Sequence, residues 1–213
     1  MKGVDEYFGN QDGNSDLTRI YIHLGVSGNT IMYEIEERGK NEKSFRVPDE
    51  QGEAPQKEPI NNNLCIDNYL NCKLNVDQLV EEVNEHLENC KTHIPLSDLV
   101  LDSANDKIKY SLIVKSTKDA ISEQEDIRKL EDYTSNLEKC VSLITKNGSF
   151  CKKSNNAGLF ICNYCYYSSL HHTQPKHNCY SLFIHVPPHD LINIDNQIEF
   201  VKALVHCIVK QLS

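Results

Sequence analysis

Two short segments of the sequence combine residue types that can carry out nucleophilic chemistry. Cys162 lies in AGLFICNYCYYSSL, residues 157–170, and His185 lies in FIHVPP, residues 183–188. A cysteine near the start of a helix gains from the helix dipole and from free N–H groups, which favour the thiolate. A histidine that ends a strand before a Pro-Pro turn is held at the carboxyl edge of the sheet, where ligands usually bind. The two residues therefore suit a cysteine nucleophile and its general base.

Both residues also have an ordinary structural interpretation. A cysteine inside a helix is often a small buried hydrophobe, and a histidine in an apolar strand is often a hydrogen-bonded core residue. The spacing alone leaves both interpretations open.

Metal binding is a further alternative. Cys162 and Cys165 form a Cys-x-x-Cys pair, and more potential zinc ligands follow: His171, His172, His177 and Cys179. This spacing is similar to that of a small zinc site. Against zinc, the helix also carries an apolar pattern that suits a core: Tyr164, Tyr166, Tyr167 and Leu170. We therefore predict neither a metal nor an organic cofactor.

The two segments together resemble the catalytic motifs of the pyroglutamyl-peptidase I family, also called pyrrolidone-carboxylate peptidases. AGLFICN resembles the family's Ala-Gly-x-(Tyr/Phe)-(Leu/Ile)-Cys-(Asn/Asp) motif, and FIHVP resembles its Phe-(Val/Ile)-His-(Val/Leu)-Pro motif. HLGVSG at 23–28 resembles its Gly-x-(Ala/Ser)-Gly segment, and PDEQGEAP at 48–55 its Pro-Asp-x-x-Gly-x-x-Pro loop. The resemblance covers residues 18–80 and 149–213.

This resemblance implies a cysteine omega-peptidase that removes N-terminal pyroglutamate from peptides through a Cys-His-Glu triad and a thioester. Cys162 would be the nucleophile and His185 its base. Counted without gaps, the family's acid falls on Glu36 and its following asparagine on Asn41. One gap would move the acid to Glu37, which therefore remains a rival.

Two parts of the family pattern have no match. Nothing matches the family's first strand and its Gly-Phe-Gly-Pro-Phe type loop, which helps to build the lactam pocket, so we expect an N-terminally shortened domain with weak activity. The charged segment at about 88–147 is predicted to be an insertion. The alternative is therefore a catalytically weak or inactive family member that acts as a binding protein.

The surrounding elements follow from apolar periodicity. Strands are predicted at 17–25, 112–114, 149–154 and 180–186, and helices at 75–89, 123–144, 158–170 and 193–212. The last helix is expected to bury one apolar face: Ile194, Ile198, Val201, Val205, Ile208 and Leu212. Alternating strands and helices predict a single α/β domain over 18–213, a three-layer α/β/α sandwich with a mostly parallel sheet. Residues 1–17 are expected to be disordered or loosely attached.

Composition limits the partners. The net charge of −9 at pH 7 argues against nucleic acid, which needs clustered Lys and Arg, and against a polybasic membrane anchor. No stretch approaches the roughly 18–20 apolar residues of a membrane span. The nine cysteines are scattered and do not resemble a disulfide framework. We predict a soluble, reduced, cytoplasmic protein that acts on peptides, with a homo-oligomer as one option for its assembly.

Overall fold

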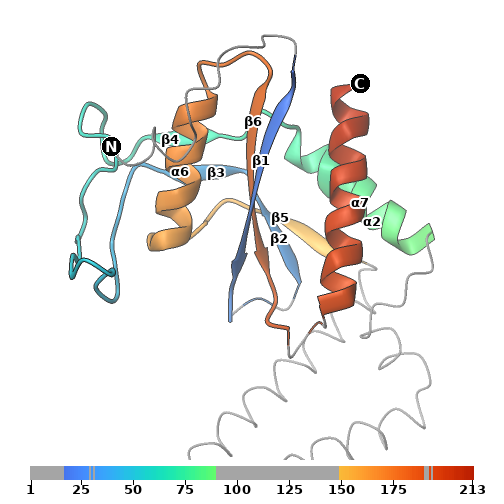
Figure 1. Cartoon of the computed structure of the whole chain (residues 1–213), viewed down its shortest axis with the longest axis horizontal. Coiled ribbons are helices and arrows are strands. Elements are labelled where there is room, and N and C mark those ends of the chain that lie inside the picture. The colour runs from blue at the N-terminus through green and yellow to red at the C-terminus, as the bar shows by residue number, and fades with distance from the viewer. Residues whose placement is uncertain (1–16, 29, 31, 90–148, 190–191, 193) are drawn as a thin grey trace, which may run out of the picture. The chain divides into compact units, whose positions relative to one another are not determined.

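The chain folds into helices and strands of an α/β protein (Figure 1). The computed structural model describes residues 17–28, 30, 32–89, 149–189, 192 and 194–213. Its elements are β1 (Arg19–Val26), β2 (Tyr33–Glu36), β3 (Arg38–Lys40), β4 (Tyr69–Asn71), α2 (Val76–Asn89), β5 (Cys151–Ser154), α6 (Ile161–Thr173), β6 (Cys179–Val186) and α7 (Ile194–Leu212). The predicted strand at 112–114, the predicted helix at 123–144 and nearly all of the predicted insertion at 88–147 lie outside the described residues.

The main sheet has four strands in the order β1-β6-β2-β5. Backbone hydrogen bonds join the start of β1 to the start of β6 and the two ends to each other, so this pair is parallel. The same pattern makes β2 and β5 parallel, whereas β2 and β6 are antiparallel. The predicted α/β fold with a mostly parallel sheet is thus confirmed. Strands β3 and β4 form a separate antiparallel pair.

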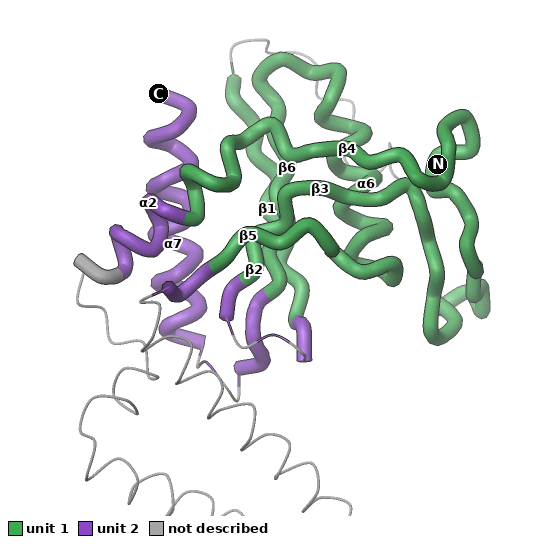
Figure 2. Tube along the Cα trace, turned by 180° about the vertical axis from the view of Figure 1, so that it is seen from behind, with its two compact units in different colours: residues 1–26, 34–80, 152–185 green, residues 27–33, 81–151, 186–213 purple. Residues whose placement is uncertain are grey.

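The described residues divide into two compact units (Figure 2). Unit 1 holds the described residues of 1–26, 34–80 and 152–185, and unit 2 holds those of 27–33, 81–151 and 186–213. All three residues of the predicted triad fall in unit 1.

Helix α6 organises unit 1, where it lies against β1, β3 and β4. It begins at Ile161, three residues later than predicted, because Gly158 has a φ of 75° that no helical residue adopts. The helix contributes Tyr166 and Leu170 to a buried cluster with Ala157 and Phe183. Its apolar side is therefore a core side, as the tyrosine pattern predicted.

Helix α7 corrects one prediction. Ile194, Ile198 and Val205, expected on its buried face, are 60 %, 45 % and 40 % exposed. The buried stripe runs along Phe200 instead and shares Ile208 with the predicted face: Phe200, Ala203, Leu204, Cys207 and Ile208. Phe200 stacks on Tyr33 of the same unit with ring centroids 3.6 Å apart. The flat contact between these large rings explains why this stripe is the buried one.

Helix α2 matches its prediction closely. Its apolar stripe is buried at Val76, Leu79, Val83 and Leu87. Asn75 caps the amino end of the helix, because its side chain accepts a hydrogen bond from the Gln78 amide at 3.2 Å. Among the helices that the structure describes, none is long and apolar enough to cross a membrane.

Candidate active site

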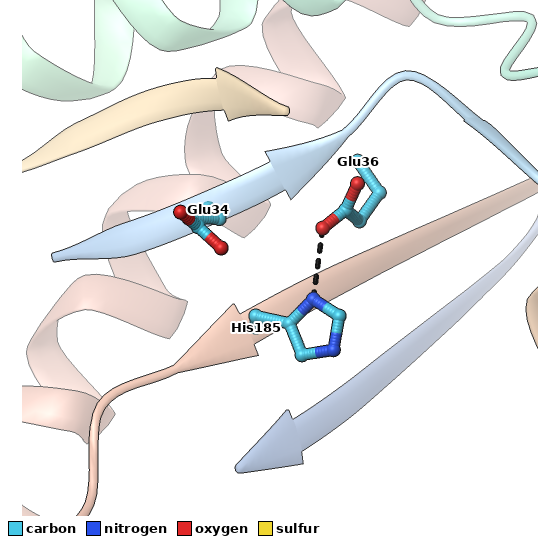
Figure 3. Close-up of side chains that lie close together, drawn as sticks. All are labelled: Glu34, Glu36 and His185. Atoms are coloured by element: carbon cyan, nitrogen blue, oxygen red, sulfur yellow. Dashed lines mark hydrogen bonds and ion pairs between the residues drawn. The ribbon is translucent and has the colours of Figure 1, made fainter. Parts of the chain in front are cut away.

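The antiparallel register of β2 and β6 brings a glutamate to a histidine. Glu34 pairs with His185 and Glu36 pairs with Phe183, so Glu36 and His185 are diagonal neighbours. Residues two apart in a strand share a face, and a long side chain can reach a diagonal neighbour. The Glu36 Oε1 atom lies 2.8 Å from His185 Nδ1 (Figure 3). Glu36 is fully buried, and the His185 side chain is 11 % exposed.

The rival glutamate faces elsewhere. Strand parity changes with every residue, so a shift by one position moves a side chain to the other face of a sheet. The Glu37 carboxylate lies 3.5 Å from Lys153 Nζ, which also pairs with Asp77 at 2.7 Å. The structure therefore places Glu36, and not Glu37, beside His185.

The Cys162 thiol completes the arrangement. Cys162 is the second residue of α6, is partly buried, and lies close enough to His185 to help raise the pKa of the imidazole. Phe160 occupies the N-cap position, and its apolar side chain makes no capping hydrogen bond. The first N–H groups of an α-helix have no intrahelical acceptor, so they favour negative charge at this end.

Gly25 of β1 permits this close packing. A Cβ atom on Gly25 would lie 2.7 Å from the Phe183 ring and 3.2 Å from the Cys162 sulfur. Gly25 was predicted as the last residue of its strand, and it lies in β1, which continues to Val26. Its role here is to let the helix carrying the thiol approach the sheet.

The electrostatics favour a charged His185. Burial opposes the imidazolium, but hydrogen bonds with Cys162 and Glu36 and the negative charges of both outweigh it. Together these effects raise the pKa of His185 to about 9. At neutral pH the ring is therefore an imidazolium, with a proton on each nitrogen, beside the sulfur of Cys162 and the carboxylate of Glu36.

Asn163, next to the thiol, fixes the start of α6. Its side-chain amide donates to the carbonyls of Lys40 at 2.9 Å and Glu42 at 2.7 Å, and its Oδ1 accepts from the Lys40 amide at 2.8 Å. Asn163 is buried, so these bonds are protected from water. Asn163 stood in the recognised motif, but its partners lie far away in the sequence and gave no local signal.

Asn41 has a similar role in the following loop. Its amide donates to the carbonyls of Asn61, Leu64 and Cys65, and its Oδ1 accepts from the Asn61 amide at 2.7 Å. It therefore holds the segment after β3 against the loop before β4, and it does not contact the Cys162 thiol.

A second thiol and imidazole lie one helical turn further on. The Cys165 sulfur is 3.6 Å from His23 Nδ1, and His23 Nε2 is 2.9 Å from Ser169 Oγ. Burial lowers the pKa of His23 and raises that of Cys165, which the nearby Cys162 raises further. The sequence had given Cys165 only as a zinc ligand and had not singled out His23. His23 and Gly25 are two residues apart in the predicted strand, so they share one face of it. This spacing could have placed His23 near the site from the sequence alone.

The proposed zinc ligands do not converge. Among the described residues, the acidic, histidine and cysteine side chains that lie close enough to share one ion are Glu34, Glu36 and His185. The potential ligands after Cys165 have other neighbours: His171 contacts Asn61, His172 contacts Lys176, and His177 contacts Asn178. None of these three histidines therefore contacts Cys162 or Cys165 through the hydrogen bonds that the described residues make.

An α/β fold that places a thiol near an imidazole, and hydrogen-bonds that imidazole to a buried carboxylate, has the arrangement that cysteine peptidases use. The family model of pyroglutamyl peptidase matches residues 113–209, the part of the chain that holds Cys162 and His185. No curated protein matches the chain.

Solved structures share the fold. A point mutant of pyrrolidone carboxyl peptidase from the hyperthermophile Pyrococcus furiosus is 20 % identical with a TM-score of 0.55, over 91 % of this chain and 70 % of that one. Pyroglutamyl peptidase I from Bacillus amyloliquefaciens is 17 % identical with a TM-score of 0.53, over 89 % of this chain and 65 % of that one. The family match and this fold confirm the resemblance to the pyroglutamyl-peptidase family.

Proposed function

We propose that this chain is a cysteine peptidase that removes N-terminal pyroglutamate from peptides. The observation that carries the proposal is the chain of side-chain contacts from Glu36 through His185 to Cys162. The family match over the segment with the thiol and the imidazole supports it, and so does the fold of the solved peptidases.

In the proposed reaction, the Cys162 thiolate attacks the carbonyl carbon of the pyroglutamyl residue. The imidazolium of His185 then gives its proton to the departing amine, and a thioester on Cys162 remains. His185, now neutral, takes a proton from water, and the resulting hydroxide cleaves the thioester. Glu36 keeps the ring oriented through Nδ1 and stabilises its positive charge in both steps.

The developing oxyanion needs hydrogen-bond donors close to Cys162. The uncapped amino end of α6 supplies backbone N–H groups in its first turn. This end also carries the positive pole of the helix, which favours the anion over the neutral carbonyl. No step in this mechanism requires a metal or an organic cofactor.

The described cysteines fit the proposed cytoplasmic location. All seven are free thiols: Cys65, Cys72, Cys151, Cys162, Cys165, Cys179 and Cys207. A reducing compartment keeps such thiols available for chemistry.

The decisive experiment is hydrolysis of a fluorogenic pyroglutamyl amide by the purified full chain. We expect release of the fluorophore, its loss in Cys162→Ala, and its retention in Cys65→Ser, which removes an exposed thiol outside the site. The prolyl amide is the matched substrate control, because it keeps the ring but lacks the lactam carbonyl. Hydrolysis that survives in Cys162→Ala would exclude Cys162 as the nucleophile.

The same assay separates the peptidase from the binding-protein alternative. A chain that binds a pyroglutamyl peptide in calorimetry but does not cleave it acts as a binding protein. A chain that does neither contradicts both proposals. The value of kcat/KM, compared with that of a known pyroglutamyl peptidase, tests the expectation of weak activity.

A further inference from the structure

Two thiols lie one turn apart at the start of α6. Cys162 and Cys165 are both free and partly buried. Residues three apart in a helix are neighbours, with Cβ atoms about 5–6 Å apart. Both also face the same side of β1: Cys165 contacts His23, and a Cβ on Gly25 would touch the Cys162 sulfur. The proposed peptidase reaction uses only the first of them.

We propose that Cys165 is a resolving cysteine, which forms a reversible disulfide with Cys162 after a hydroperoxide has oxidised Cys162. The pair is thus a redox modification site next to the nucleophile. The proposal needs a reactive Cys162, but it does not need the chain to cleave pyroglutamyl peptides.

The reaction has two steps. In the first, the Cys162 thiolate attacks one oxygen of hydrogen peroxide, an S–O bond forms and the O–O bond breaks. Cys162 becomes a sulfenic acid, and the released hydroxide takes the proton of the His185 imidazolium to give water. In the second step, the Cys165 sulfur attacks the Cys162 sulfur, the S–S bond forms and the S–O bond breaks. The hydroxyl group leaves as water with the Cys165 proton, which His23 can carry.

The surroundings of the two sulfurs fix the order of these steps. Cys162 lies at the amino end of α6 beside the positively charged His185, which are the surroundings in which a cysteine reacts readily with peroxide. Burial raises the pKa of Cys165, and the neighbouring Cys162 raises it further, so Cys165 stays a thiol. Peroxide therefore reacts first with Cys162, and Cys165 acts on the product.

The geometry also makes the disulfide easy to reduce. A relaxed disulfide joins Cβ atoms about 3.5–4.5 Å apart, which is closer than a regular helix places them. The first turn of α6 must therefore tighten against the hydrogen bonds that tie Asn163 to Lys40 and Glu42, which adds strain to the disulfide. Strained disulfides are more oxidising and are reduced by cellular thiols more readily than structural ones.

Peptide mapping of the oxidised protein tests the proposal directly. The reduced full chain is treated with hydrogen peroxide, alkylated, digested and analysed by mass spectrometry. We expect a peptide that carries a Cys162–Cys165 disulfide, with the loss of two hydrogen atoms, and its disappearance after dithiothreitol. Oxidation that leaves Cys162 untouched, or that joins it to any other cysteine, would overturn the proposal.

Two single variants then test the protective role. In Cys165→Ser the resolving thiol is lost, so Cys162 should proceed to sulfinic and sulfonic acid that dithiothreitol cannot reduce. Cys65→Ser removes an exposed thiol elsewhere and should recover its Cys162 thiol as the unmodified chain does. Equal recovery of the Cys162 thiol in both variants would show that Cys165 does not react with the oxidised Cys162.

These readouts are masses of peptides, so they do not depend on peptidase activity. If the chain hydrolyses no pyroglutamyl amide yet forms the linked peptide, the function proposed above fails and the disulfide proposal stands. If the chain is an active peptidase but shows no linked peptide, the disulfide proposal fails and the proposed function stands.

Discussion

At the scale of residues, Glu36 has two carboxylate oxygens but one partner. Its Oε1 contacts His185, whereas its Oε2 is buried without a hydrogen-bond partner among the described residues. A buried carboxylate is costly unless a positive charge compensates it. The imidazolium of His185 provides that charge, and Glu36 in turn helps to raise the pKa of His185.

The first prediction concerns the reactivity of Cys162. At neutral pH, iodoacetamide should label it faster than the other cysteines, because a helix end and a charged His185 favour its thiolate. Cys207 is a suitable comparison, because burial raises the pKa of its thiol. Time-resolved peptide mapping measures both rates, and equal rates would contradict the assignment of Cys162 as the nucleophile.

The second prediction separates the two glutamates. Glu36→Gln should lower kcat by at least about a hundredfold, because the neutral amide no longer stabilises the His185 imidazolium. Glu37→Gln should change kcat little, since Glu37 pairs with Lys153. Hydrolysis of the pyroglutamyl amide measures both variants, and the opposite result would move the acid to Glu37.

The third prediction concerns pH. The pKa of His185 is raised from 6.5 to about 9, so the groups around it, Glu36, Glu34 and the Cys162 sulfur, face a cation at neutral pH. A raised folded-state pKa gives stability that is complete below pH 6.5 and is lost as the pH rises through about 9.

Urea unfolding of the native chain and of His185→Gln measures this effect. The difference in their free energies of unfolding should shrink from about pH 6 to about pH 10. A difference that stays constant, or grows with pH, would show that His185 is not charged in the folded protein. Activity should fall on the alkaline side as well, because neutral His185 cannot protonate the departing amine.

At the scale of elements, the longer strands and helices and the short strand β5 could be predicted, whereas the short strands β2, β3 and β4 could not. Apolar periodicity indicated β1, β6, α2 and α7 to within a few residues. Strand β2 has four residues, too few for a period to be recognised. Its glutamate was found by counting along a family motif, and the choice between Glu36 and Glu37 needed the register with β6. Pairing between distant segments is information that local patterns do not contain.

The same limit applies to Asn163. Its partners on β3 and after it lie more than a hundred positions away in the chain, although the residue itself stands beside Cys162. We predict that Asn163→Ala lowers the free energy of unfolding by about 1–3 kcal/mol, because it leaves buried backbone groups unsatisfied. Asn155→Ala, at an exposed position, should cost less than about 0.5 kcal/mol.

Urea unfolding measures both free energies of unfolding. Iodoacetamide labelling of Cys162 in the same variants shows whether the hydrogen bonds of Asn163 also affect the reactivity of the thiol. If Asn163 holds the start of α6, its loss should also slow the labelling of Cys162. Normal stability together with normal labelling in Asn163→Ala would show that the hydrogen bonds of Asn163 are dispensable.

At the scale of the whole molecule, each unit is built from segments that are distant in the sequence (Figure 2). No contiguous stretch of the chain shows which surface of a helix such a unit buries. Helix α7 illustrates this, because its sequence carries two apolar stripes and the prediction chose the one rich in isoleucine. The buried stripe is the one with Phe200, which finds the ring of Tyr33 from a segment far earlier in the chain.

The burial of this stripe can be tested with one pair of variants. Phe200 is fully buried and stacked on Tyr33, so Phe200→Ala should lower the free energy of unfolding by about 3–5 kcal/mol. Ile198 lies on the other stripe and is 45 % exposed, so Ile198→Ala should cost less than about 1 kcal/mol. Urea unfolding followed by circular dichroism measures both.

If Phe200→Ala does not fold, Phe200→Leu, with an expected cost of about 1–2 kcal/mol, replaces it in the comparison. A larger loss in Ile198→Ala than in either Phe200 variant would mean that α7 buries the isoleucine stripe after all.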